Sequence, residues 1–183
     1  MANKTSEQYD QVVDKCRQIF EKKIKDYGTS WRVLRTMSLT DQIFIKAKRV
    51  KTIEELGNAK IEEGIEEEFI GMFNYGIIAL IQMHIANNAP MELSETEAMK
   101  HYDLETKQTK ALMMAKNHDY GEAWRDMRIN SYTDLILMKL MRLKQIEDNK
   151  GKTLISEGAE SHYMDIVNYA AFGLIKLSEG QKN

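Results

Sequence analysis

The sequence predicts an all-α protein made of two copies of one three-helix unit. A shift of 93 residues superposes the chain on itself, with 18 identities over the 47 positions from Tyr9 to Glu55. Only one proline and ten glycines interrupt 183 residues whose apolar positions recur with helical spacing. Three amphipathic helices leave apolar faces uncovered, so we expect the tandem duplicated units to pack as one pseudo-two-fold helical bundle.

The duplication also divides the chain. After one inserted residue the match resumes at a shift of 94, where Asn74-Tyr75 corresponds to Asn168-Tyr169. We expect a first repeat over residues 1–86, a linker over 87–93 that contains the single proline, and a second repeat over 94–183. The alternative is two separate bundles, which the short linker and the small size of each unit disfavour.

The first helix of each copy has a clear beginning and end. Residues 5–8 and 94–97 both fit the capping-box spacing, in which side chains satisfy the free N–H groups at a helix start. Each helix should end at Asp-Tyr-Gly, because Gly28 and Gly121 tolerate the left-handed conformation that closes a helix.

Two more helices follow in each copy. The second should begin near Thr40 and near Thr133, where a threonine and an aspartate offer a cap and a first-turn acid. The third should run from about residue 61 to 83 and from about 154 to 177, with acids in its first turns and apolar residues beyond.

Composition limits the classes of function. The net charge of -2 disfavours nucleic acid and anionic membranes as partners. No signal peptide or membrane-spanning run is visible, so we expect a cytoplasmic protein with no membrane partner. A single cysteine, Cys16, excludes an intramolecular disulfide. A homo-oligomer is left open.

Carboxylates at the start of the last helix form a candidate metal site. We expect Glu157 and Glu160 to share a helical face with Asp165 near them, an arrangement of oxygen ligands that suits Mg²⁺. The alternative is that these acids only favour the helix dipole. In the first repeat the equivalent positions are Glu63, Glu66 and Gly71, and a glycine cannot supply a ligand. Glu63, Glu66 and the nearby Glu67 form a second candidate site.

Basic residues recur on the second helix of each copy. Lys46 and Arg49 return as Lys139 and Arg142, and a lysine and an arginine three residues apart on one helix could hold phosphate oxygens. The alternative is that they form ion pairs with acids on the third helix, or are simply solvated.

Aromatic residues at the turn after the first helix are the most distinctive repeated feature. Tyr27 and Trp31 return as Tyr120 and Trp124, and their rings could stack on a nucleobase. The alternative is that they fill the junction between helices, as tryptophan commonly does in a compact helical repeat.

Three segments together resemble a known family. They are K-N-H-D-Y-G-E-A-W from Lys116, T-D-L-I-L-M-K-L-M-R-L from Thr133 and M-D-I-V-N-Y-A from Met164. They resemble the nucleotide modification associated domain 1 family, a domain of unknown function, in a tandem form that spans residues 7–178. The family is in turn distantly similar to the all-α nucleoside triphosphate pyrophosphatases of the MazG and dimeric dUTPase type.

The resemblance implies a nucleotide partner and, through the pyrophosphatases, a magnesium-dependent hydrolase that cleaves a nucleoside triphosphate to monophosphate and pyrophosphate. The chain departs from the MazG pattern, because its second helix offers Lys and Arg where that pattern has acids. The sequence therefore leaves three readings open: a pyrophosphatase, a protein that binds nucleotides without cleaving them, and a non-catalytic helical interaction module.

Overall fold

The computed structural model describes residues 3–57 and 64–180, and within them every regular element is helical, as predicted. In this part of the chain no helix is long and apolar enough to cross a membrane. The first repeat contains α1 (Lys4–Tyr27), the 3₁₀ turn η1 (Ser30–Val33), α2 (Thr36–Leu56) and α3 (Ile65–His84). The second contains α4 (Glu95–Tyr120), η2 (Ala123–Asp126), α5 (Ile129–Asp148) and α6 (Ala159–Ser178).

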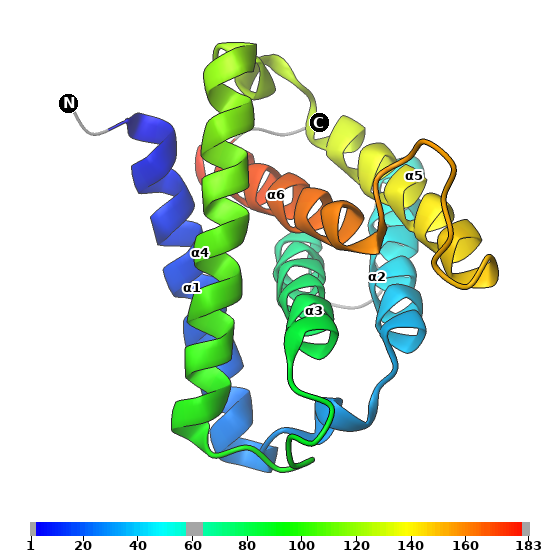
Figure 1. The fold of residues 1–183 in the computed structure, drawn as a ribbon. Helices are drawn as coiled ribbons and strands as arrows, with labels where there is room; N and C mark the ends of the chain where they lie inside the picture. Colours follow the sequence, from blue (N-terminus) through cyan, green and yellow to red (C-terminus); the bar gives the residue numbers. More distant parts are fainter. Residues whose placement is uncertain (1–2, 58–63, 181–183) are drawn as a thin grey trace.

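Helices α3 and α6 form the centre of the bundle. They lie between α1 and α4 on one side and α2 and α5 on the other (Figure 1). Both are apolar and buried along most of their length, as a helix packed on several sides must be. Gly76 allows their close approach, because a Cβ atom at this position would lie 2.5 Å from Cγ2 of Val167.

Buried hydrogen bonds show that the repeats are related by a pseudo-two-fold axis. The hydroxyl of Tyr9 in the first repeat donates to Oδ1 of Asn168 in the second, at 2.7 Å. The equivalent Tyr102 donates to Oδ1 of Asn74, also at 2.7 Å. Each repeat thus contributes the donor of one bond and the acceptor of the other, so the two copies pack against each other as a symmetric pair.

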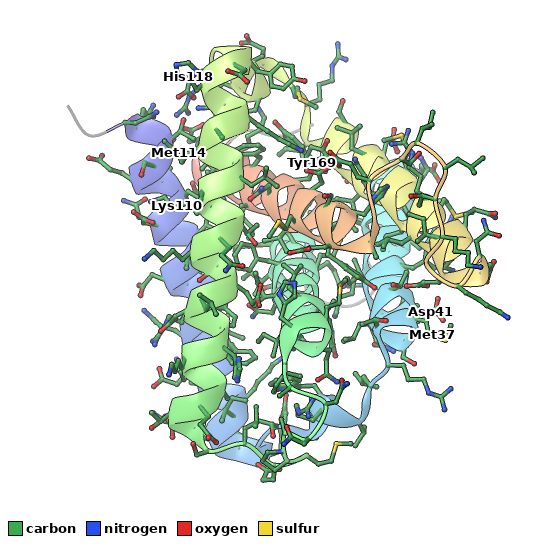
Figure 2. The ribbon with its side chains drawn as sticks, viewed as in Figure 1. Met37, Asp41, Lys110, Met114, His118 and Tyr169 are labelled. Atoms are coloured by element: carbon green, nitrogen blue, oxygen red, sulfur yellow. The ribbon has the colours of Figure 1, made fainter. Side chains whose placement is uncertain are left out.

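Surface ion pairs follow the same symmetry. Lys51 on α2 contacts Asp134 on α5 at 2.8 Å, and the equivalent Lys144 contacts Asp41 at 3.3 Å. Lys110 on α4 likewise contacts α1, at Asp10. Figure 2 labels Asp41 and Lys110 on the two sides of the bundle.

Three predicted helix starts were wrong. Asn3, rather than residues 5–8, caps α1, since its Oδ1 accepts a 2.9 Å hydrogen bond from the Thr5 amide. Helices α2 and α5 begin four residues before Thr40 and Thr133, because each follows its 3₁₀ turn almost directly. The capping box at residues 94–97 and the helix ends before Gly28 and Gly121 are confirmed.

The third helix of each repeat, in contrast, begins later than predicted. Helix α6 starts at Ala159, after an exposed loop, and the backbone of Gly158 is its N-cap. Glu157 therefore precedes the helix and does not share a helical face with Glu160, contrary to the prediction. Helix α3 starts at Ile65, and residues 61–63 lie outside the described residues.

Candidate functional site

A cavity of about 650 Å³ lies in the first repeat, between the C-terminal half of α1, η1, α2 and α3. Four residues proposed from the sequence line it. They are Tyr27, Trp31, Lys46 and Glu67. Lys23 and Tyr75, which the sequence analysis did not propose as site residues, also line it, as do Gly71 and Glu68. The sequence analysis favoured the second repeat, whereas this cavity lies in the first.

Trp31 forms part of the wall of the cavity. The 3₁₀ turn that follows α1 carries its ring inward, where it packs against Phe20 with ring centroids 6.1 Å apart. The side chain is 7% exposed, and its indole Nε1 has no hydrogen-bond partner. A buried donor without an acceptor is costly, by about 1–3 kcal/mol. Tyr27, by contrast, is 57% exposed beside it.

Two lysines bring positive charge to the cavity. Lys46 on α2 lies 5.7 Å from the ring centroid of Tyr75 and 3.6 Å from a carboxylate oxygen of Glu68. Glu68 is held more closely by Arg49, at 2.7 Å, so its charge is already largely balanced. Lys23 on α1 makes no ion pair with any described residue. Glu67 and Glu68 line the same cavity, so an anion would be bound by the ammonium groups of Lys23 and Lys46 themselves and not by an excess of positive charge.

The equivalent lysines of the second repeat, Lys116 and Lys139, both form ion pairs with Asp165. Nζ of Lys116 lies 2.7 Å from Oδ1 of Asp165, and Nζ of Lys139 lies 2.8 Å from Oδ2. Asp165 is 5% exposed. At a shift of 94 it corresponds to Gly71, which has no side chain. Lys116 and Lys139 therefore share one buried counterion, whereas in the first repeat Lys23 and Lys46 line a cavity and only Lys46 contacts a described carboxylate, that of Glu68 at 3.6 Å.

The pKa of Asp165 reflects this contact. Burial alone would raise its pKa, but the hydrogen bonds and charges of Lys116 and Lys139 outweigh burial and lower the pKa below its usual value. Burial acts in the opposite sense on Lys116, and its bond to Asp165 raises the pKa of Lys116 overall. Both groups are therefore charged at neutral pH.

The two tryptophans differ in the same way. Nε1 of Trp124 donates a 3.0 Å hydrogen bond to Glu122. Thr29 occupies the equivalent position in the first repeat. The Trp124 ring stacks on Phe172 with centroids 4.4 Å apart, and the guanidinium of Arg125 lies 4.4 Å from its centroid. Packing within the protein, the alternative considered for the tryptophans, thus describes Trp124, and its stacking on a base stays a prediction.

The three acids proposed to hold magnesium are not gathered around one point. Glu157 is exposed in the loop before α6, Glu160 contacts Nε2 of His84 at 3.1 Å, and Asp165 is bound by the two lysines. Among the described residues, no three His, Cys, Asp or Glu side chains are placed to hold a metal ion. These three acids, as arranged, do not fit Mg²⁺, and magnesium binding stays a prediction from the resemblance.

The acids of the second candidate site have protein partners of their own. Glu66 forms an ion pair with Lys15, and Glu67 accepts a 2.8 Å hydrogen bond from the amide of Gly64 at the start of α3. Glu63 lies outside the described residues. Glu67 therefore acts at least as a helix cap at the edge of the cavity.

Two other predicted residues of the second repeat are exposed. Arg142 is exposed on α5 and lines a shallow groove together with His162. The ring of Tyr120 is 73% exposed. The structure does not bring either into a site with Trp124.

The duplication itself carried a signal for the residues that were missed. Lys23 recurs as Lys116 and Tyr75 as Tyr169 at the shifts that align the two copies. The single difference that matters, Gly71 against Asp165, was also visible, but it was interpreted as a lost metal ligand. Only the contacts of Asp165 with two lysines show that it is a gained counterion.

Comparison with known proteins gave one match. The family model described as nucleotide modification associated domain 1 matches the chain twice, at residues 23–83 and at residues 116–177. Each match runs from the end of the first helix of a repeat through its third helix. Neither a curated protein nor a solved structure matches the chain significantly. The more distant similarity to MazG-type pyrophosphatases stays a prediction.

Proposed function

This chain belongs to the nucleotide modification associated domain 1 family, and from that premise we propose that the cavity of its first repeat binds a nucleotide. The single observation that carries the proposal is the pair of lysines, Lys23 and Lys46, that line the cavity while their second-repeat counterparts are neutralised by Asp165. The words of the family description support the same ligand class.

The anionic end of a nucleotide suits the lysines. An ammonium group is a compact point charge that binds phosphate oxygens, and such charge-assisted bonds are stronger than neutral ones. Glu68 is shared between Lys46, at 3.6 Å, and Arg49, at 2.7 Å, so its single charge balances only part of theirs. A volume of about 650 Å³ is of the size that small-molecule sites have.

The aromatic residues suit the base. Tyr27 is 57% exposed and Tyr75 is half-buried, so both present ring surface at the cavity. Flat rings of this kind stack on other flat rings with a modest gain in free energy. Trp31, which is 7% exposed, also lines the cavity.

The proposal is one of binding and contains no cleavage step. The described acids at the cavity edge are engaged by Gly64 and Arg49, and none of them is gathered into a metal site. Hydrolysis of a triphosphate, which the resemblance to pyrophosphatases implies, is read out separately in the experiment below.

The experiment is titration calorimetry with nucleoside mono- and triphosphates and with the free nucleosides, with and without Mg²⁺. We expect phosphorylated ligands to bind, nucleosides to bind at least tenfold more weakly, and Lys46→Met to weaken nucleotide binding by about tenfold or more. Lys48→Met is the matched control, because Lys48 lies exposed on the same helix and does not line the cavity.

Equal affinities in Lys46→Met and Lys48→Met, or no binding of any nucleotide, would overturn the proposal and favour the non-catalytic interaction module. Chromatography of the same mixtures shows whether monophosphate and pyrophosphate appear. Products would add cleavage to binding, and binding without products would match the proposal as stated.

A further inference from the structure

We propose that Asp165 is a built-in anion, which occupies in the second repeat the position where the first repeat binds the phosphate of its ligand, beside Lys23 and Lys46. The inference rests on the proposed function and names the part of the cavity that holds the anionic group. It also states that the chain has one such position per molecule, because the other is filled by its own side chain.

The symmetry of the fold places Asp165 and Gly71 at equivalent positions. The reciprocal bonds from Tyr9 to Asn168 and from Tyr102 to Asn74 pin α3 and α6 to their neighbours in the same register. Asp165 lies three residues before Asn168, and Gly71 lies three residues before Asn74. A side chain at either position therefore points to the same side of its helix.

The geometry at Gly71 shows that a side chain there would meet Lys46. A Cβ atom at this position would lie 2.7 Å from Cε and 3.1 Å from Nζ of Lys46. Those atoms are the mobile end of a flexible side chain, so they can shift to receive a carboxylate. The second repeat shows that outcome, with Lys139 at 2.8 Å from Asp165.

Two carboxylates of the second repeat stand at aligned positions where the first repeat has none, while in the first repeat Glu68 contacts Lys46 at 3.6 Å. Asp165 satisfies two ammonium groups, and Glu122 satisfies the indole N–H of Trp124. The first repeat has Gly71 and Thr29 at these places, and Nε1 of Trp31 is buried without an acceptor. The anion position proposed for the first repeat is the one at Gly71, beside Lys46.

The test compares Gly71→Asp with Gly71→Asn, two side chains of nearly the same volume that differ in charge. The probes are inorganic pyrophosphate and the tightest nucleotide, and the readout is affinity by calorimetry. We expect Gly71→Asp to bind pyrophosphate at least tenfold more weakly than Gly71→Asn does, because the carboxylate takes up both lysines. Equal affinities in the two variants would mean that volume alone blocks the cavity and would overturn the inference.

A second variant tests the other repeat. Asp165→Gly should free Lys116 and Lys139 and raise the number of pyrophosphates bound per chain from about one to about two. In the double variant Gly71→Asp with Asp165→Gly, we expect one site again, now sensitive to Lys139→Met and insensitive to Lys46→Met. Circular dichroism checks that the helices are intact. If Asp165→Gly does not fold, the comparison of Gly71→Asp with Gly71→Asn tests the inference without it.

The two proposals fail in different ways. Nucleotide binding that is lost in Lys46→Met but equal in Gly71→Asp and Gly71→Asn would overturn the anion position and leave the proposed function standing. Pyrophosphate binding that is lost in Gly71→Asp, with no nucleotide bound by the wild-type chain, would keep the anion position and overturn the proposed function. A wild-type chain that binds neither probe would overturn both.

Discussion

The hydroxyl of Tyr9 on α1 donates a 2.7 Å hydrogen bond to Oδ1 of Asn168 on α6, across the boundary between the repeats. The amide of Asn168 in turn donates to the backbone carbonyl of Thr109 at 3.3 Å. One asparagine thus ties together helices from both repeats. The pseudo-two-fold axis repeats the arrangement at Tyr102 and Asn74.

Removing this hydroxyl should destabilise the bundle. We expect Tyr9→Phe to lower the free energy of unfolding by about 1–2 kcal/mol, because it leaves the buried Oδ1 of Asn168 without that donor. Tyr102→Phe should cost a similar amount, since the fold places it equivalently. Urea denaturation followed by circular dichroism measures both. Tyr120→Phe, at a ring 73% exposed, is the control and should change stability by less than about 0.5 kcal/mol.

The close contact between α3 and α6 gives a second prediction. Gly76→Ala should destabilise the protein by about 1–3 kcal/mol, because the new methyl group would lie 2.5 Å from Cγ2 of Val167 in a packed core. Val167→Ala in the same chain should recover part of that loss by removing the clashing methyl. Chemical denaturation of the two single variants and the double variant tests the coupling, and strictly additive effects would contradict it.

The lowered pKa of Asp165 predicts that the protein loses stability in acid. Its folded pKa lies below the unfolded value of about 3.9, so its contribution is present above that value and is lost as the pH falls through the folded pKa. Asp165→Asn should cost about 1–3 kcal/mol at pH 7, since it leaves Lys116 and Lys139 facing each other without a counterion. It should also flatten the acid limb of a stability–pH curve, and an unchanged acid limb in Asp165→Asn would contradict the prediction.

The raised pKa of His84 predicts that the stability of the protein falls as the pH rises near neutrality. Burial lowers its pKa, but contacts with Glu105 at 2.8 Å and Glu160 at 3.1 Å outweigh burial and raise the pKa. Because the folded pKa exceeds the unfolded value of about 6.5, its contribution is full below that value and is lost as the pH rises through the folded pKa.

NMR titration of the imidazole signals measures this directly. We expect His84 to titrate above the unfolded value of about 6.5, and Glu160→Gln to shift the pKa of His84 downward because one carboxylate charge is removed. Stability measured from pH 6 to 9 should fall more in the wild-type chain than in His84→Gln. A pKa for His84 at or below about 6.5 would contradict the prediction.

Much of the fold could be predicted from residues that lie close together in the sequence. The self-match at a shift of 93, the helical spacing of apolar residues, the closing glycines Gly28 and Gly121 and the capping box at Ser94 all predict features that the structure confirms. These features depend on interactions within one or two helical turns, which a sequence displays as fixed spacings. The starts of α2, α5 and α6 were less predictable, because 3₁₀ turns and loops lack such periodicity.

The state of each repeat's lysine pair depends on the tertiary structure. Lys46 and Lys139 are the same residue at equivalent positions, yet one lines a cavity and the other is bound to Asp165. The difference arises on another helix, at Gly71 and Asp165, and no spacing along one helix reveals that these positions meet the lysines. Helix packing brings the groups within reach of each other, and since the attraction between two charges strengthens as they approach, packing decides which of them form ion pairs.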